Sequence, residues 1–126
     1  MLFRMTIRLL SSGTSIPMRS SGMPQHSVYT EYVFEWDPRK AEANAAKHGV
    51  SFDDAVTVFL DANALDGRDL RHSEAEARFL RLGQDADGRV LMVAYTLRRS
   101  GNAETIRLIS ARRASRRERT AYSAKD

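Results

Sequence analysis

The sequence predicts an α+β domain with a small antiparallel β-sheet of three to four strands. Two N-terminal helices are expected to pack on one face of the sheet, and a basic helix to close the chain. Two segments with helix caps follow a short β-type run near residue 32, and the second also has helical apolar spacing. Three more β-type runs follow at short intervals, and short connections favour antiparallel neighbours.

The first predicted strand covers 32–36, where Tyr-Val-Phe-Glu-Trp is rich in aromatic and branched residues. Asp37 and Pro38 then predict a helix start, because Asp is a good N-cap and Pro is tolerated at the first helical position. The helix is expected over 39–48. Gly49 is expected to end it, since glycine readily adopts the left-handed conformation found at helix C-termini.

A second helix is predicted from Ser-Phe-Asp-Asp at 51–54, a pattern in which the serine caps the helix. Four apolar residues have the i, i+3, i+4, i+7 spacing of one helix face: Phe52, Ala55, Val56 and Phe59. The polar and acidic stretch that follows, 60–76, is expected to be a loop with one weak strand around 63–66.

Three β-type runs complete the predicted sheet, at 77–82, 89–97 and 104–110. The second run is the most apolar in the chain and is expected to be the central strand. Asp87-Gly88 lies between the first two runs and is a strong hairpin signal. Gly83 is expected to end the first run. The sheet is therefore predicted to be built from hairpins.

Positive charge is concentrated in the C-terminal third. Residues 97–126 contain nine Arg and Lys against three Asp and Glu, whereas the whole chain has a net charge of only +4. Ser115 and Glu118 form a second capping pattern, which predicts a basic helix to about residue 124. A basic surface placed in this way indicates a polyanionic partner, either nucleic acid or an acidic protein.

Residues 1–30 differ from the remainder, because they contain three Arg, no acidic residue and many Ser, Gly and Pro. We predict a disordered extension or an over-extended start there, with one domain over 31–126; the composition also resembles an organelle transit peptide. The chain has no Cys, which excludes disulfides and thiol chemistry. No apolar run approaches the roughly 20 residues that span a bilayer.

Lys47 and His48 are the first candidate site residues, at the end of the first predicted helix. Lysine suits a phosphate contact, and an imidazole exchanges protons near neutral pH. The alternative is that both residues only complement the helix dipole at the surface.

His72, Glu76 and Arg78 form a second candidate group in and after the acidic loop. Residues i and i+2 share a strand face, so Glu76 would meet Arg78 if the strand begins early, and would orient the guanidinium or act as a base. The alternative is a solvated ion pair worth under about 1 kcal/mol.

Arginines supply the third group. Arg107 interrupts an apolar strand and would mark the open face of the sheet; together with Arg78 it would bind a phosphate, although an edge-strand charge is the alternative. Phosphate binding is also predicted at the start of the last helix, by some of Arg112, Arg113, Arg116, Arg117 and Arg119. The chain has no H-x-x-x-H or H-E-x-x-H pattern, so we predict no metal site and no cofactor.

Three segments together resemble the BrnT-type ribonuclease toxins of bacterial type II toxin–antitoxin systems. The first is 34–52, which contains Lys-His-Gly-Val-Ser-Phe, and the second is 69–78. The third joins 90–96 to 106–122 and contains Ile-Arg-Leu-Ile-Ser-Ala-Arg-Arg-Ala. The resemblance covers about residues 32–123.

The resemblance implies a RelE-like fold and metal-independent RNA cleavage in the cytoplasm that halts translation. In that reaction the 2′-hydroxyl attacks the adjacent phosphorus, while the protein stabilises charge and transfers protons. By the same resemblance, Arg78 and Arg112 would contact the phosphate, Lys47 would assist, and His48 or Glu76 would transfer protons. The remaining arginines would bind RNA: Arg107, Arg113, Arg116 and Arg117.

The resemblance also implies a cognate BrnA-like antitoxin, a DNA-binding protein that covers the active face, usually in a heterotetramer. Two other functions stay open on the sequence. One is a catalytically degenerate toxin that still binds the antitoxin as a co-repressor. The other is a plain RNA-binding protein without an antitoxin, which would show salt-sensitive binding and no cleavage.

Overall fold

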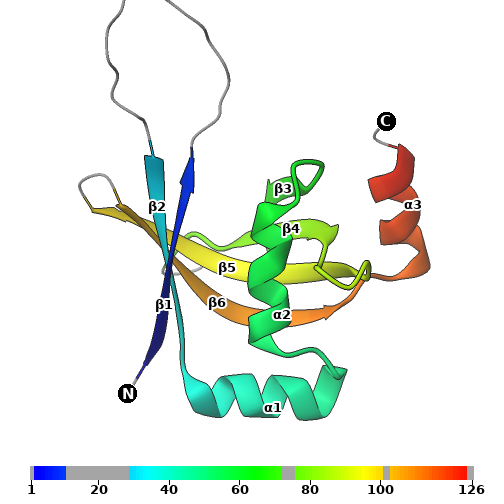
Figure 1. The fold of residues 1–126 in the computed structure, drawn as a ribbon. Helices are drawn as coiled ribbons and strands as arrows, with labels where there is room; N and C mark the ends of the chain where they lie inside the picture. Colours follow the sequence, from blue (N-terminus) through cyan, green and yellow to red (C-terminus); the bar gives the residue numbers. More distant parts are fainter. Residues whose placement is uncertain (1, 11–28, 72–75, 101–102, 125–126) are drawn as a thin grey trace, which may run out of the picture.

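A computed structural model describes residues 2–10, 29–71, 76–100 and 103–124 of the chain (Figure 1). Its elements, in chain order, are β1 (Phe3–Leu10), β2 (Tyr29–Trp36), α1 (Pro38–His48), α2 (Phe52–Thr57), the short 3₁₀ helix η1 (Val58–Leu60), β3 (Leu65–Arg68), β4 (Phe79–Gln84), β5 (Val90–Ser100), β6 (Ala103–Arg113) and α3 (Arg116–Ala124). The predicted α+β class is confirmed.

The strands form one six-stranded mixed sheet in the order β1-β2-β6-β5-β4-β3. Strands β2 and β6 pair in parallel, and the other neighbours pair antiparallel. The prediction of an all-antiparallel sheet of three to four strands is therefore wrong. Its error has a physical cause: β2 is separated from β3 by two helices, so it enters the sheet beside the last strand rather than beside its successor.

Strand β1 pairs with β2 along its whole length, although it lies within residues 1–30, where the sequence predicts no strand. Phe3, Met5, Ile7 and Leu9 alternate with polar residues, which is the strand period. The ring of Phe3 stacks on Trp36, with 4.6 Å between the ring centroids. Phe3–Leu10 is thus a strand of the sheet, while the division of the chain near residue 31 stays a prediction.

The predicted helix caps are confirmed. Asp37 Oδ1 accepts the N–H of Arg39 at 2.9 Å, and Ser51 Oγ accepts the N–H of Asp54 at 3.0 Å. Gly49 has a φ of 70°, which lets the chain turn sharply between α1 and α2. Because of this turn the two helices run in different directions (Figure 1), and they follow two strands rather than opening the fold. The helix arrangement therefore differs from the predicted pair.

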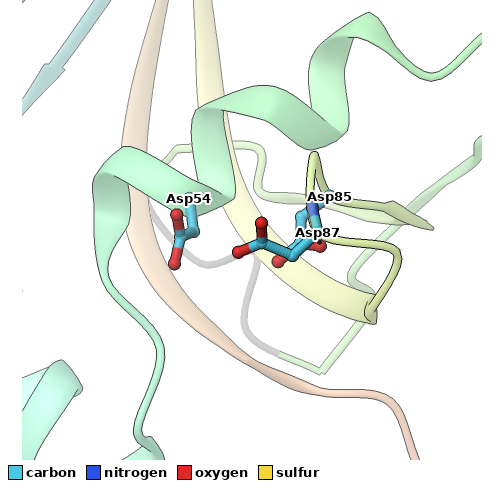
Figure 2. A group of neighbouring side chains, drawn as sticks. All are labelled: Asp54, Asp85 and Asp87. Atoms are coloured by element: carbon cyan, nitrogen blue, oxygen red, sulfur yellow. Dashed lines mark hydrogen bonds between the residues drawn. The ribbon is translucent and has the colours of Figure 1, made fainter.

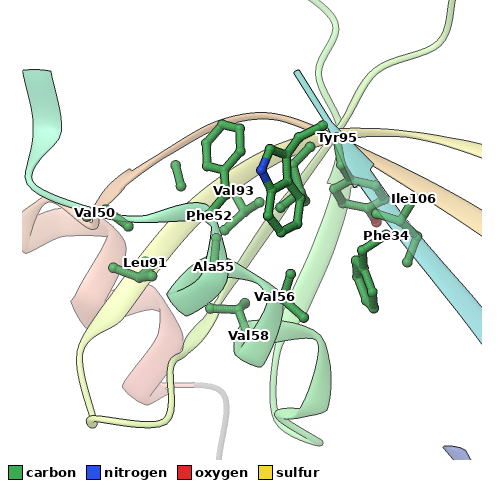
Figure 3. Close-up of a cluster of buried hydrophobic side chains, with 13 residues drawn as sticks. Phe34, Val50, Phe52, Ala55, Val56, Val58, Leu91, Val93, Tyr95 and Ile106 are labelled. Carbon is green, nitrogen blue, oxygen red and sulfur yellow. The ribbon is translucent and has the colours of Figure 1, made fainter. Parts of the chain in front are cut away.

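The hydrophobic core lies between the sheet and the segment that contains α2 and η1 (Figure 3). Helix α2 and η1 contribute four buried residues, namely Phe52, Ala55, Val56 and Val58. The strands contribute Phe34, Trp36, Leu91, Val93, Tyr95, Ile106, Leu108 and Ala111. Trp36 meets the edge of the Phe52 ring at 5.8 Å between centroids. One face of the sheet is thus covered by α2 and η1.

Strand β4 continues through Gly83 to Gln84, beyond the predicted end at residue 82. A Cβ added at Gly83 would lie 2.9 Å from Val58 Cγ1 and 3.0 Å from Ala64 Cβ. This glycine is therefore required for the close approach of η1 to the strand, and it does not end the strand. Gly88, with a φ of 90°, makes the predicted hairpin between β4 and β5.

Candidate active site

The face of the sheet opposite the core contains a hollow of about 760 Å³. Alternation along β5 separates the two faces: Leu91 and Val93 are buried in the core, whereas Met92 and Ala94 line the hollow. The hollow is lined by Lys47, His48, Arg68, Asp69, Leu70, Arg71, Arg78, Leu80, Met92, Ala94, Ile109, Ser110, Arg112 and Glu118. Its apolar lining comes mainly from strands, whereas most of its charged residues come from helices and loops, with Arg68 and Arg112 on strands.

A β-bulge shapes this hollow. Ala94 pairs with Ser110 and Tyr95 with Leu108, so Ile109 is an additional residue in β6. Both Ile109 and Ser110 line the hollow, although neighbouring residues of a regular strand lie on opposite faces. The bulge therefore brings an extra apolar side chain to the open face.

Four predicted site residues meet at the hollow. Lys47 and His48 come from the end of α1, Arg78 lies just before β4, and Arg112 is the penultimate residue of β6. Strand β6 is longer than predicted, so Arg112 is fixed on a strand rather than on the approach to a helix. Three segments far apart in the sequence thus place three cations and an imidazole around one site.

Asn44 holds the end of α1 against the strand that carries Arg112. Its side chain is buried; Nδ2 donates to the carbonyls of Val50 at 3.1 Å and Ala111 at 2.8 Å, and Oδ1 accepts the N–H of Ala111 at 3.1 Å. Strand β2 pairs with β6 only as far as Arg107, so Asn44 takes the place of a strand neighbour for Ala111. Because Arg112 directly follows Ala111, this contact fixes Lys47 and His48 relative to Arg112.

Arg112 and Glu118 form a two-bond ion pair in the hollow. Arg112 Nη1 donates to Glu118 Oε1, and Nη2 to Oε2, both at 2.9 Å. The predicted capping box is also confirmed: Ser115 Oγ accepts the N–H of Glu118 at 3.1 Å, and Glu118 Oε1 accepts the N–H of Ser115 at 2.8 Å. The hydrogen bonds from Arg112 are the largest influence that lowers the pKa of Glu118 to about 2, and the same bonds raise the pKa of Arg112.

The other predicted site residues lie outside the hollow. Glu76 pairs with the exposed Arg98, with 3.4 Å between Oε2 and Nε, and not with the hollow's cations. Arg107 does not line the hollow: it pairs with Thr96, next to Tyr95, whose partner in β4 is Phe79, and its convergence with Arg78 on a phosphate stays a prediction. Exposed positions around the start of α3 are occupied by Arg113, Arg116, Arg117 and Arg119. His72 lies outside the described residues.

Residues 68–71 contribute four side chains that the sequence analysis does not predict for the site: Arg68, Asp69, Leu70 and Arg71. The N–H of Asp69 donates to the carbonyl of Arg78 at 2.8 Å, and Asp69 Oδ1 accepts the N–H of Arg71 at 3.2 Å. These bonds hold the loop against the approach to β4. Three of these residues begin the segment 69–78 that carries part of the family resemblance, but residue type alone indicates no role for them.

Within the described ranges, Asp54, Asp85 and Asp87 place carboxylate oxygens within 4.8 Å of one another (Figure 2). Arg89 supplies positive charge to this group, since its guanidinium lies 3.0 Å from both Asp54 Oδ2 and Asp85 Oδ2. Asp85 Oδ1 also accepts the N–H groups of Asp87 and Arg89. The group therefore clamps the β4–β5 hairpin to α2, and none of its members lines the hollow.

The fold and the hollow define a class of small α+β proteins with cations gathered on the open face of the sheet, an arrangement that favours an anionic ligand. Residues 36–118 match the family model described as the ribonuclease toxin, BrnT, of type II toxin–antitoxin systems. Because this match covers more than half of the chain, the chain belongs to the BrnT family of ribonuclease toxins.

The chain is also similar to the BrnT ribonuclease toxin of Brucella abortus, known from a crystal structure. The two share 25% sequence identity over 64% of this chain and 94% of that chain, with a TM-score of 0.47. A search of curated proteins found no match. None of the helices in the described segments is long and apolar enough to cross a membrane.

Proposed function

We propose that this toxin cleaves RNA in the hollow without a metal ion, by attack of a ribose 2′-hydroxyl on the adjacent phosphorus. The bond from the 2′-oxygen to phosphorus forms a 2′,3′-cyclic phosphate as the bond from phosphorus to the 5′-oxygen breaks. One proton leaves the 2′-hydroxyl and one is delivered to the departing 5′-oxygen. The observation that supports this proposal is the meeting of Lys47, His48, Arg78 and Arg112 around one hollow. Family membership supplies the ribonuclease activity, and the mechanism is the part that is proposed.

Each residue has a proposed role that follows from its chemistry. Arg78 and Arg112 contact the phosphate and stabilise the negative charge that develops on its oxygens. Lys47 adds a third positive charge, and His48 transfers the proton because imidazole is both donor and acceptor near neutral pH. Glu76 is the less suitable proton-transfer group, since it pairs with Arg98 outside the hollow.

The apolar part of the hollow suits the remainder of a nucleotide. Leu80, Met92 and Ile109 line it together, and all three are partly exposed. A base or ribose that lies on these side chains removes apolar surface from water, while its phosphate reaches the surrounding cations. The exposed arginines Arg113, Arg116 and Arg117 extend the positive surface towards α3, where they would contact neighbouring phosphates.

The first test is expression of the chain from a tightly controlled promoter, beside the double variant Arg78→Ala/Arg112→Ala, with growth and total RNA followed. We expect growth arrest and RNA loss from the wild type alone, because one well-placed stabilising donor contributes on the order of 3 kcal/mol, about a hundredfold in rate. Circular dichroism of both purified proteins controls for folding. No arrest from a folded wild type would contradict the proposal and favour a degenerate toxin or a plain RNA-binding protein.

Two purified-protein assays test the mechanism. RNA whose 2′-hydroxyls are replaced by 2′-O-methyl groups should bind and remain intact, since the attacking nucleophile is then absent. Cleavage of ordinary RNA should continue in EDTA. Loss of activity in EDTA that returns with a divalent cation would contradict the metal-free mechanism, and cleavage of the methylated RNA would contradict 2′-hydroxyl attack.

A type II toxin has a cognate antitoxin. We propose that this antitoxin is a BrnA-like DNA-binding protein that covers the hollow and forms a heterotetramer with the toxin. One equivalent of the protein encoded beside the toxin should then abolish RNA cleavage, and the mass of the purified complex should equal two copies of each chain. A complex that still cleaves RNA would show that the antitoxin binds elsewhere.

A further inference from the structure

Arg112 has only part of its guanidinium available to a ligand. Its Nη1 donates to Glu118 Oε1 at 2.9 Å and to the carbonyl of Arg113 at 3.2 Å, while Nη2 donates to Glu118 Oε2 at 2.9 Å. A guanidinium has five N–H donors. Three of them are therefore engaged within the protein.

The two remaining donors of Arg112 lie on the same edge of the guanidinium. They are the Nε–H and the second Nη2–H, and neither has a hydrogen-bond partner among the described residues. Two parallel donors of this kind match two oxygens of a phosphate. The side chain of Arg112 is also 43% exposed in the ion pair, so a ligand in the hollow can reach it.

Glu118 is itself held in place, which makes it a suitable support for Arg112. Its own N–H and one carboxylate oxygen are engaged by Ser115 in the capping box. Helix α3 is held at both ends: Arg119 Nη1 donates to the carbonyl of Ala114 at 2.9 Å, and the Tyr122 hydroxyl donates to Asp61 Oδ2 at 2.6 Å. The carboxylate of Glu118 thus has little freedom to move away from Arg112.

We propose that Glu118 is a positioning residue that fixes the guanidinium of Arg112 and leaves its Nε–Nη2 edge for two oxygens of the RNA phosphate. The proposal rests on the phosphate-binding role of Arg112 proposed above. Without Glu118 the arginine side chain adopts many rotamers, and ordering it costs free energy each time RNA binds or reacts. Glu118 itself does not contact the substrate in this mechanism.

If Glu118 competed with RNA for Arg112 instead of positioning it, the predicted change in RNA affinity would have the opposite sign. A carboxylate that only occupied the phosphate site would compete with RNA, and its removal would strengthen binding. A carboxylate that positions Arg112 weakens binding and slows cleavage when it is removed. The sign of the change in RNA affinity therefore separates the two roles.

The experiment is a double-mutant cycle in the full chain with Arg112→Ala, Glu118→Gln and the double variant. The readouts are the single-turnover cleavage rate of RNA and the dissociation constant for 2′-O-methyl RNA. We expect Glu118→Gln to lower the rate about tenfold and Arg112→Ala about a hundredfold. The double variant should equal Arg112→Ala alone, because Glu118 acts through Arg112.

Ser115→Ala is the matched control for the structural role of Glu118. It removes the Ser115 hydroxyl that caps α3 but retains the backbone N–H and both Arg112–Glu118 bonds. We expect a thermal midpoint lower by about 4–8 °C and a cleavage rate within about twofold of the wild type. A tenfold slower Ser115→Ala protein would show that cap stability, and not the ion pair, controls the site.

The outcomes distinguish failure of this proposal from failure of the proposed function. An unchanged rate in Arg112→Ala overturns the role of Arg112 in cleavage. If Arg112→Ala slows cleavage strongly and Glu118→Gln does not, the positioning role of Glu118 is overturned and the role of Arg112 stands. The same is true if the Glu118→Gln effect persists in the Arg112→Ala background, or if Glu118→Gln binds the methylated RNA more tightly.

Discussion

The two faces of the sheet use arginine in different ways. On the helix-covered face, all three nitrogens of Arg81 are engaged: Nε donates to the carbonyl of Val58, Nη1 to Asp66 and Nη2 to the carbonyl of Asp61. On the open face, Arg112 has one carboxylate partner and an edge without a partner in the described parts of the chain. An arginine with a protein partner at every nitrogen supports the fold, whereas one whose Nε has no partner among the described residues is suited to a ligand.

The apolar residues of β5 show the same difference between faces. Leu91 and Val93 are 0% exposed in the core, while Met92 lines the hollow and is partly exposed. Consecutive residues of one strand therefore serve packing and ligand contact in turn. Substitutions at neighbouring positions of β5 therefore separate effects on the stability of the protein from effects on RNA binding.

The largest predicted effect on stability comes from Leu91→Ala. We expect it to lower the free energy of unfolding by about 2–5 kcal/mol, because it leaves a cavity in the core. Met92→Ala should cost much less stability but weaken RNA binding, since it removes part of the apolar lining of the hollow. Urea unfolding and binding of 2′-O-methyl RNA measure the two quantities. Equal losses of stability in both variants would contradict the distinction between the faces.

An intermediate effect is predicted for Arg81→Ala. It should lower the free energy of unfolding by about 2 kcal/mol, because it removes three hydrogen bonds and the contact of the guanidinium with the Phe59 ring, 5.0 Å from its centroid. RNA affinity should stay within about twofold of the wild type. A loss of affinity comparable to that of Arg112→Ala would show that charge anywhere on the protein controls RNA binding.

The smallest predicted effect is the acid sensitivity that Glu118 contributes. The pKa of Glu118 is lowered to about 2 in the folded protein from an ordinary value of 4.5, so its ion pair stabilises the fold fully above pH 4.5. This contribution is lost as the pH falls from 4.5 towards 2. The difference in thermal midpoint between wild type and Glu118→Gln should therefore shrink over that window. A difference in thermal midpoint that is constant with pH would contradict the lowered pKa of Glu118.

Local signals in the sequence predict much of this fold. Asp37, Gly49, Ser51 and Ser115 define helix ends correctly because capping depends on residues within one turn of the chain. The Asp87-Gly88 hairpin is predicted for the same reason. The parallel pairing of β2 with β6 is not, because it joins segments about seventy residues apart and depends on tertiary packing.

The site is predictable in part. Lys47, His48, Arg78 and Arg112 are identified from residue type and from resemblance, and the structure brings them together. The bulge at Ile109 is not predicted, because it depends on strand register, and it changes which side chains reach the open face. Asn44 carries no sequence signal of its role, since its three partners are backbone groups that any residue could supply.

The position of β6 has a consequence for when the hollow can form during synthesis of the chain. This strand lies between β2 and β5, although it is synthesised after both of them. Until β6 emerges from the ribosome, β2 and β5 have no shared neighbour, and neither Arg112 nor the anchor of Asn44 exists. A chain interrupted before β6 thus lacks Arg112 and the buried contact of Asn44 with Ala111, so the proposed site can form only in the finished protein.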